Sequence, residues 1–388
     1  MKTIYLDHNA TTPTDRRVLE AMLPYFADRF GNPSSPYGLA HDPRRAVDAA
    51  RLSVATALGC APDHIVFTGC GSESDNIAIQ GCVAVCDGPP GHIVTTAIEH
   101  HAVLHTCRHL ERCGWHVTYL GVNDGGLVDA GDVERALRPE TRLVTIMHAN
   151  NEVGTLQPLV DIGAMLQGRS VTFHTDAVQS VGKVPVKVDE LGVDLLSLSA
   201  HKFYGPKGVG ALYVRPGTSV SPIAFGGQQE RGLRPGTENV PGIVGLATAL
   251  EIAVDEMDET IERLRTLTAR LTSGILESIP DVIVNGDENH RIPGTANVSF
   301  PGVEGESIVL GLDMEGIAVS TGSACTTDAV GPSHVLAAMG LTPNAAQGSV
   351  RFGLGRHTTE PDIDHVLSVL PEVVKRLRAM SPFGSQDS

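Results

Sequence analysis

The residues with the clearest chemical potential in this chain lie in LSLSAHKFYGPKGVG, residues 196–210. An apolar, β-prone run over residues 193–198 predicts a strand that delivers Ser199, His201 and Lys202 to the following turn. The end of a strand is where an open α/β sheet exposes its reactive groups. An amine held there can form a Schiff base with a carbonyl compound, and burial lowers its pKa. A solvated lysine in a tight turn is the alternative interpretation.

A second chemical candidate is FTGCGSESDN, residues 67–76. A strand pattern leads through a glycine-rich turn into a helix start, where backbone N–H groups point outward without intrahelical partners. The helix dipole also favours an anion there, so Gly71 and Ser72 are candidates for phosphate binding. The spacing matches neither a Walker A loop nor a dinucleotide-binding G-x-G-x-x-G motif. An ordinary capped helix start is the alternative.

Two further predicted strands end in polar groups. Asp176, in HTDAVQ at residues 174–179, could pair with a protonated heteroaromatic nitrogen, although aspartate is also a common helix N-cap. The amides of HANNEVG, residues 148–154, include Asn151 and could bind a phenolic oxygen or a carboxylate without adding charge. Amides in a turn need no ligand, so a purely structural role stays open.

Histidines are concentrated around AIEHHAV, residues 97–103. His100 could stack on a ring or transfer protons near neutral pH. His101, His105 and His109 follow at helical spacing, which raises the possibility of a metal site. The apolar residues between them instead indicate a solvated histidine face opposite a packed one, and no H-E-x-x-H motif occurs. We therefore predict no metal.

Cys325 is the cysteine that we predict to be reactive. It lies in STGSACTTDAVGPSHVL, residues 320–336, which has the small and polar composition of a mobile loop. Structural cysteines usually lie among apolar side chains, whereas a thiol on such a loop is accessible. The seven cysteines form neither a disulfide framework nor a paired zinc pattern, so we expect free thiols in a reducing compartment.

The elements that must position these groups alternate between short strands and helices. Strands are expected at residues 65–68, 93–96, 117–120, 143–147, 171–174, 195–198 and 211–214. This alternation predicts an α/β fold with a seven-stranded, mostly parallel sheet. Before the sheet, apolar spacing predicts helices over residues 16–30 and 46–58.

The alternation of short strands and helices ends near Pro241, where a long helical region over residues 243–279 begins. Mixed structure follows, with strands at residues 282–284, 296–300 and 317–320 and helices around 335–339 and 363–380. A chain of 388 residues exceeds what one hydrophobic core usually organises. We predict a large domain over residues 15–255, a smaller α+β domain made of residues 1–14 and 256–380, and a disordered tail at residues 381–388.

Charge and targeting signals narrow the functional classes. A formal net charge of −16 argues against direct nucleic-acid binding and against an anionic-membrane surface. The N-terminal MKTIYLDHNATTP lacks the apolar core of a signal peptide, and no run approaches the length of a membrane span. We expect a cytoplasmic protein without membrane association.

Taken together, these stretches resemble the NifS/IscS-type cysteine desulfurases, a group of the class V aminotransferase family that uses pyridoxal 5′-phosphate. The matching motifs run in the family's order from YLDHNATTP to RFGLGRHTTE and include GNPSSPYG, FTGCGSESDN, EHHAV, HANNEVG, HTDAVQS, SAHKFYGPKG, RPGTENV, GSACTTD and RFGLG. The resemblance implies pyridoxal-phosphate fold type I, L-cysteine as substrate, a homodimer and a sulfur-acceptor protein as partner.

The resemblance also implies roles for residues that match the motifs. Lys202 would hold the cofactor covalently, Asp176 would pair with its ring nitrogen and Gln179 would bond its ring hydroxyl. His100 would stack on the ring and transfer protons, and Cys325 would be the third catalytic residue. The phosphate would be bound by Gly71, Ser72, Ser199, His201 and, from the neighbouring subunit, Thr237. The substrate would be held by Asn151 and Arg351.

The implied reaction converts L-cysteine into L-alanine and leaves a persulfide on Cys325 for iron–sulfur cluster assembly or for tRNA or DNA sulfur modification. Two departures from the family pattern are Cys70, which replaces a glycine and implies that the backbone there is not glycine-only, and Ser72, which replaces a threonine. RPGTENV and Asn9 also resemble selenocysteine lyases. A selenocysteine lyase, another fold-type I enzyme, or a scaffold in a sulfur-transfer complex are the alternatives.

Overall fold

A seven-stranded sheet is the largest feature of the computed structural model, which describes residues 3–86, 88–322 and 332–380. Its strand order is β2-β8-β7-β6-β5-β3-β4. The strands are β2 (Ile65–Thr68), β3 (His92–Thr96), β4 (His116–Leu120), β5 (Thr141–Thr145), β6 (Thr172–Asp176), β7 (Leu195–Ser199) and β8 (Gly210–Val214). β8 runs antiparallel to both of its neighbours, β2 and β7, and the other strand pairs in this sheet are parallel. The predicted seven-stranded, mostly parallel α/β sheet is confirmed.

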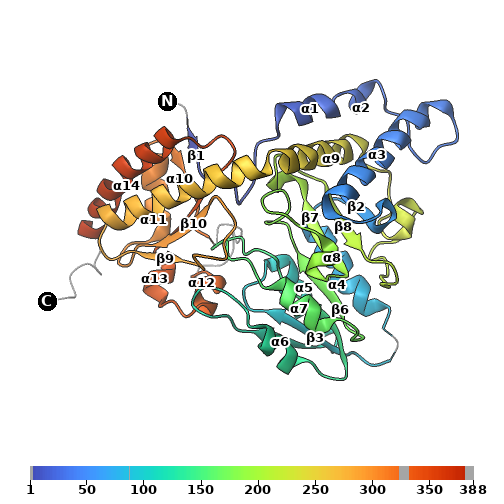
Figure 1. The fold of residues 1–388 in the computed structure, drawn as a ribbon, viewed down its shortest axis with the longest axis horizontal. Coiled ribbons are helices and arrows are strands. Elements are labelled where there is room, and N and C mark those ends of the chain that lie inside the picture. The colour runs from blue at the N-terminus through green and yellow to red at the C-terminus, as the bar shows by residue number, and fades with distance from the viewer. Residues whose placement is uncertain (1–2, 87, 323–331, 381–388) are drawn as a thin grey trace.

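Helices cover the sheet on both sides, as α/β alternation requires, and Figure 1 shows them around the strands. They are α3 (His41–Leu58), α4 (Gly71–Ala84), α5 (His101–Arg112), α6 (Ala130–Ala136), α7 (Leu159–Leu166), α8 (Val188–Leu191) and α9 (Val240–Asp255). Strands covered on two faces must be apolar along their length. Every residue of β7 is accordingly buried.

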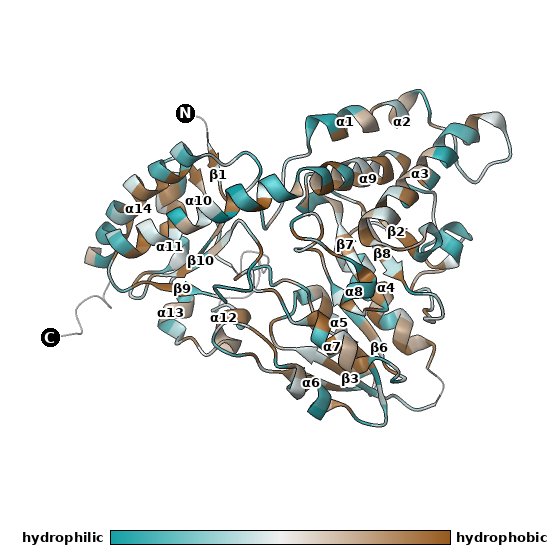
Figure 2. Cartoon of the chain, viewed as in Figure 1, coloured by the Kyte–Doolittle hydropathy of each residue, from teal (hydrophilic) through white to brown (hydrophobic). Residues whose placement is uncertain are grey.

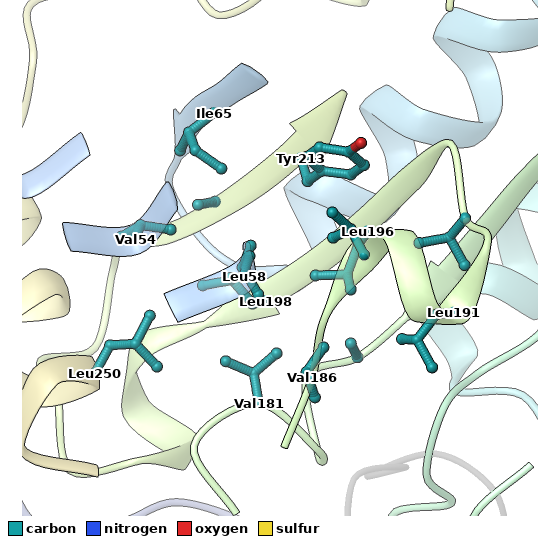
Figure 3. Close-up of a cluster of buried hydrophobic side chains, with 14 of the residues drawn as sticks. Val54, Leu58, Ile65, Val181, Val186, Leu191, Leu196, Leu198, Tyr213 and Leu250 are labelled. Atoms are coloured by element: carbon teal, nitrogen blue, oxygen red, sulfur yellow. The ribbon is translucent and has the colours of Figure 1, made fainter. Parts of the chain in front are cut away.

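The core beside β7 is built from aliphatic side chains. Figure 3 shows Leu196 and Leu198 of this strand together with Val54 and Leu58 of α3 and Leu250 of α9. These helices come from distant parts of the sequence and pack against each other on one side of the sheet. The packing fixes the end of β7, from which the Lys202 turn departs.

The segment predicted as one helix over residues 16–30 is instead two short helices, α1 (Arg16–Met22) and α2 (Pro24–Ala27). The prediction was wrong because Pro24 has no N–H to continue the helical hydrogen bonds of α1, whereas proline is well suited to the first position of a new helix. The apolar spacing alone did not reveal this break.

The C-terminal part has its own core and smaller sheets. One sheet has the order β12-β10-β9, and β1 pairs with β11 in a second. The strands are β1 (Ile4–Tyr5), β9 (Ile283–Asn285), β10 (Thr295–Ser299), β11 (Ile317–Ala318) and β12 (Ser349–Gly353), and the helices are α10 (Met257–Ser278), α11 (Gly305–Asp313), α12 (His334–Ala338), α13 (Pro343–Gln347) and α14 (Glu360–Met380). The short strand β12 was not predicted from the sequence.

The pairing of β1 with β11 brings the N-terminal residues beside the C-terminal helices (Figure 1). A separate group of buried apolar residues, including Leu6 and Leu271, fills this region. We propose the division into residues 15–255 and residues 1–14 with 256–380 on this basis. The predicted tail at residues 381–388 lies outside the described residues.

The long helical region predicted over residues 243–279 is interrupted at Glu256, which ends α9 and precedes α10. Its φ of −97° and ψ of 9° are not helical. The two helices differ in character, since α9 is packed between α1 and α3 whereas α10 has one apolar face. Figure 2 accordingly shows α10 as the more hydrophilic of the two. Within the described ranges, no helix is long and apolar enough to cross a membrane.

Two leucines of α10 provide a matched test of this packing. Leu271 is fully buried, whereas Leu276 is 53% exposed. Replacing Leu271 by alanine is expected to lower the free energy of unfolding by about 2–5 kcal/mol, because a cavity remains in the core. Leu276→Ala is expected to change it by less than about 0.5 kcal/mol. Urea unfolding of both variants tests this, and equal losses would contradict the assigned core.

Candidate functional site

A cavity of about 240 Å³ lies where β6 and β7 end and α4 begins. Parallel strands bring their carboxyl ends to one edge of a sheet, so groups that follow different strands meet there. Ten of the residues predicted for the site line this cavity, namely Gly71, Ser72, His100, Asn151, Asp176, Gln179, Ser199, His201, Lys202 and Arg351.

The two other predicted site residues are not in the lining. Thr237 is exposed in the loop between η4 (Gln229–Gly232) and α9. Its predicted contact with the neighbouring subunit's cofactor stays a prediction. Cys325 lies outside the described residues, as do the other residues from 323 to 331.

Lys202 ends η3 (Ala200–Lys202), the single helical turn that follows β7. Its Nζ donates hydrogen bonds of 2.7 Å to the backbone oxygens of Asn9 and Ala10. Both acceptors belong to the N-terminal segment, so this segment closes one side of the cavity. The geometry therefore holds the amine at the cavity wall and excludes the alternative of a lysine solvated in a surface turn.

Asp176 is the last residue of β6 and is buried, and its Oδ1 accepts a 2.9 Å hydrogen bond from the backbone N–H of Val178. A second carboxyl group, that of Asp75 in α4, is buried at the same cavity. Burial raises the pKa of both groups, and the charge of Asp176 raises the pKa of Asp75 further. A cationic group bound in the cavity would relieve this cost, since an opposite charge favours the ionised carboxylate.

His100 is the N-cap of α5, and its Nδ1 accepts a 3.1 Å hydrogen bond from the backbone N–H of Ala102. Burial, followed by the charge of Lys202, lowers the pKa of His100 to about 4. The imidazole is therefore neutral at physiological pH. Because Nδ1 acts as an acceptor, Nε2 is the nitrogen that holds the proton.

The neutral state of His100 predicts a pH effect on stability. The folded protein protonates His100 near pH 4, whereas its ordinary pKa is 6.5. Between these values the unfolded chain binds the extra proton, so this contribution to stability is lost as the pH falls from about 6.5 to about 4. His100→Gln should therefore show a smaller drop in the urea midpoint between pH 6.5 and 4.5 than the wild type. His365→Gln, at an exposed position of α14, is the control, and a drop as steep as the wild type's in His100→Gln would contradict the assignment.

The start of α4 is where the anion cradle is predicted. Gly71 and Ser72 are its first two residues, so their N–H groups have no intrahelical partner. Cys70 is the N-cap, and its Sγ accepts a hydrogen bond of 3.4 Å from the backbone N–H of Glu73. The φ of Cys70 is −175°, which is extended backbone open to any residue. This confirms that the replacement of glycine by Cys70 needs no glycine-only conformation.

Two side chains at the end of β7 and in the turn after it line the same cavity. The Oγ of Ser199 is buried and finds no hydrogen-bond partner among the described residues. The Nδ1 of His201 lies 3.0 Å from Thr11 Oγ1, which leaves Nε2 for a ligand. A buried hydroxyl without a partner is unfavourable, so a bound oxyanion would satisfy it.

Arg351 comes from β12 and is only 2% exposed, although it is a charged side chain. Its Nη2 donates to Asp7 Oδ1 at 2.8 Å, and its Nη1 donates to the backbone oxygen of Asn151 at 2.9 Å. The planar guanidinium is thereby fixed at the cavity, where a carboxylate could be bound. Such a ligand would share this cation with Asp7.

Three residues that contribute to this arrangement were not singled out from the sequence, namely Asp7, Asp75 and Lys183. Each lies inside or beside a matching motif: Asp7 begins DHNATTP, Asp75 is in FTGCGSESDN, and Lys183 follows Gln179 by four residues. Their position inside or next to the motifs was the only sequence signal that could have pointed to them. The partners of Asp7 and Asp75 come from distant segments, so pattern alone could not assign these two residues a role.

The sequence matches the family described as "Aminotransferase class-V" over residues 4–366. The protein named "Cysteine desulfurase IscS" from Dictyoglomus turgidum is 49% identical over 98% of this chain and 97% of its own length. The protein named "Cysteine desulfurase" from Trichormus azollae is 48% identical over 100% of this chain and 97% of its own length.

Solved structures agree with these sequence matches. One titled "NIFS-LIKE PROTEIN" has a TM-score of 0.91 and 39% identity, and the match covers 97% of this chain and all of that one. Another, titled "SspA in complex with cysteine", has a TM-score of 0.82 and 40% identity over 92% of this chain and all of that one. The predicted fold type is thereby confirmed. The chain belongs to the aminotransferase class-V family, in its group of NifS/IscS-type cysteine desulfurases.

Proposed function

We propose that this protein is a pyridoxal-phosphate-dependent cysteine desulfurase that converts L-cysteine into L-alanine and transfers the sulfur to Cys325. The observation that supports this most strongly is the meeting of Lys202, Asp176, His100 and Arg351 at one cavity. Relatives named cysteine desulfurases are 49% identical over nearly the whole chain, and the structure titled as a complex with cysteine supports the choice of substrate.

The cavity fits the cofactor on which this family depends. The Lys202 amine suits the aldehyde, the buried Asp176 suits a protonated ring nitrogen, and Gln179 can donate to the ring hydroxyl. The N–H groups at the start of α4 and the partnerless Ser199 hydroxyl suit the phosphate. When bound, pyridoxal phosphate withdraws electrons from the substrate and so weakens its Cβ–S bond.

The residues of the chain perform the remaining tasks. Arg351 binds the substrate carboxylate beside Asn151, and Lys202 and His100 move protons at the substrate carbons. The Cys325 thiolate attacks the substrate sulfur, so an S–S bond forms as the C–S bond breaks. The carbon fragment takes up protons and leaves as alanine. Cysteine and one thiol thus become alanine and one persulfide, and no external oxidant or reductant is consumed.

The test is to supply purified protein with pyridoxal phosphate and L-cysteine and to measure alanine together with the mass of the Cys325 peptide. The wild type is expected to form alanine and to gain one sulfur atom on Cys325. Cys325→Ala should lose both, whereas Cys113→Ala, at an exposed cysteine after α5, should lose neither. Undiminished alanine formation by Cys325→Ala would remove the assigned role of that thiol.

The alternative activities give different products. A selenocysteine lyase would turn over selenocysteine much faster than cysteine, and an aminotransferase would form a keto acid from the substrate. A scaffold would support sulfur transfer without catalysis, so a Lys202→Ala variant would still sustain its partners. Measuring these three outcomes alongside alanine formation separates the alternatives from the desulfurase reaction.

We also propose that the protein is a cytoplasmic homodimer. It would pass sulfur to an acceptor protein that serves iron–sulfur cluster assembly, tRNA sulfur modification or DNA sulfur modification. Large apolar side chains are exposed between α1 and η1 (Gly38–Ala40), among them Phe26 at 61% and Phe30 at 67%, and a second subunit would cover them. Sedimentation of the wild type tests the dimer. Tracing labelled sulfur from cysteine into co-purified proteins tests the acceptor.

A further inference from the structure

A chain of hydrogen bonds runs behind the cavity wall from Lys183 to Lys202. Lys183 Nζ donates to Gln179 Oε1 at 2.8 Å, and Gln179 Nε2 donates to the backbone oxygen of Asn9 at 2.9 Å. The same backbone oxygen accepts from Lys202 Nζ at 2.7 Å. Gln179 lines the cavity and is only 4% exposed, so its amide has little access to water. Neighbouring protein groups, and not water, therefore determine the directions in which Oε1 and Nε2 of Gln179 point.

The partners leave the amide one orientation. A backbone carbonyl can only accept, so Nε2 must face Asn9. An ammonium group can only donate, so Oε1 must face Lys183. The amide nitrogen has two N–H groups, and one stays available to a ligand in the cavity. Gln179 thus presents a donor to the cavity, and its carbonyl oxygen is turned away.

A buried amine close to two other cations is electrostatically unfavourable. The presence of Lys183 at this position therefore calls for an explanation. Burial, together with the charges of Lys202 and Arg351, lowers the pKa of Lys183 to about 7. An apolar side chain would avoid this like-charge repulsion. The neutral amine and the ammonium ion both keep N–H groups, so the bond to Gln179 persists in either state.

We propose that Lys183 is a positioning residue that orients the Gln179 amide so that an N–H faces the ring hydroxyl of pyridoxal phosphate. This inference rests on the proposed contact of Gln179 with that hydroxyl. The hydroxyl oxygen is readily ionised, so Gln179 must offer it a hydrogen-bond donor. Without Lys183 the carbonyl of Asn9 alone would favour this orientation, and an amide that rotates away from Asn9 would present its carbonyl oxygen, which would repel the same oxygen. Lys183 itself is not among the residues that line this cavity.

The experiment compares two ligands of the apoprotein, pyridoxal phosphate and its analogue that lacks the ring hydroxyl, by their dissociation constants. Lys183→Met replaces the aliphatic part of the side chain by a group of the same number of heavy atoms and removes the donor. The variant should raise the dissociation constant of pyridoxal phosphate on the order of tenfold, the loss expected for one charge-assisted hydrogen bond. It should change the dissociation constant of the analogue by less than about threefold. Lys187→Met is the control, because Lys187 bonds carbonyls at the end of α3 instead.

Two more variants separate this inference from the assignment of Gln179. Gln179→Leu should lose the same preference for the hydroxylated ligand, and adding Lys183→Met to it should cause no further loss. If Gln179→Leu keeps the preference, the contact of Gln179 is wrong. If Gln179→Leu loses it and Lys183→Met does not, the contact stands and the role of Lys183 is overturned.

Instability of the Lys183→Met variant would not leave the question open. Lys183→Arg retains donors at this position, so it should keep the preference for the hydroxylated ligand to within about threefold. Its loss in a Lys183→Arg protein whose thermal unfolding matches the wild type would overturn the proposal. The ligand comparison requires no turnover of cysteine, so it is independent of the desulfurase reaction.

Discussion

Lys202→Ala is expected to lower kcat/KM for alanine formation from L-cysteine on the order of 10⁴-fold or more, because it removes both the covalent tether and a proton carrier. The fixed position of this amine at the cavity wall, held by the backbone oxygens of Asn9 and Ala10, is the structural reason. The variant should also lose the absorption that arises from covalently held pyridoxal phosphate. Steady-state kinetics and the absorption spectrum after gel filtration measure the two effects.

The control for Lys202→Ala is Lys207→Ala, in the same turn but exposed. It should keep the absorption of the bound cofactor and most of the activity. Alanine formation by Lys202→Ala at a rate near that of the wild type would show that another amine performs the reaction. A methylamine supplement offers a second check, since a small amine can restore part of the activity when only a side-chain amine is missing.

Asp176→Asn is expected to reduce kcat by about 10²–10³-fold, the range observed when one preorganised electrostatic partner of a developing charge is removed. Asparagine keeps the shape of the side chain and an acceptor for the N–H of Val178, which lies 2.9 Å from Oδ1. It cannot balance a positive ring nitrogen, so the bound cofactor would withdraw electrons less strongly. The substitution therefore tests the charge separately from the packing.

Pyridoxal phosphate should still bind to Asp176→Asn, because the proposed phosphate site at the start of α4 is unchanged. The expected pattern is a large loss of kcat with a retained cofactor, measured by kinetics and by the phosphate content of the gel-filtered protein. Asp161→Asn, at an exposed site of α7, is the matched control. A kcat of Asp176→Asn equal to that of the wild type would contradict the proposed pairing with the ring nitrogen.

The seven strands of the large sheet were predicted from the sequence to within two residues at each end. It could do so because buried parallel strands are short, apolar runs, and apolar character is a local property. The chemical motifs stood at the ends of these runs. Parallel strands share one edge for their carboxyl ends, so the meeting of the motif residues at one cavity was also predictable.

The contacts between polar groups within the cavity could not be predicted from the sequence. Arg351 is paired with Asp7, the Gln179 amide donates to the backbone oxygen of Asn9, and Asp75 shares the burial of Asp176. The first of these pairs joins residues 344 positions apart in the chain. Whether such side chains touch depends on how separate elements pack, and no local pattern encodes that distance.

The same division holds for the helices and for β12. Apolar spacing located the helical regions, but the breaks at Pro24 and Glu256 follow from missing backbone hydrogen bonds and from packing against different neighbours. The strand β12 is five residues long and includes the charged Arg351, so its sequence lacks a strand signal. Pairing with β10 makes it a strand, and this pairing sets Arg351 at the cavity. Residue types thus determined the chemistry available to this protein, and long-range packing decided how it is oriented.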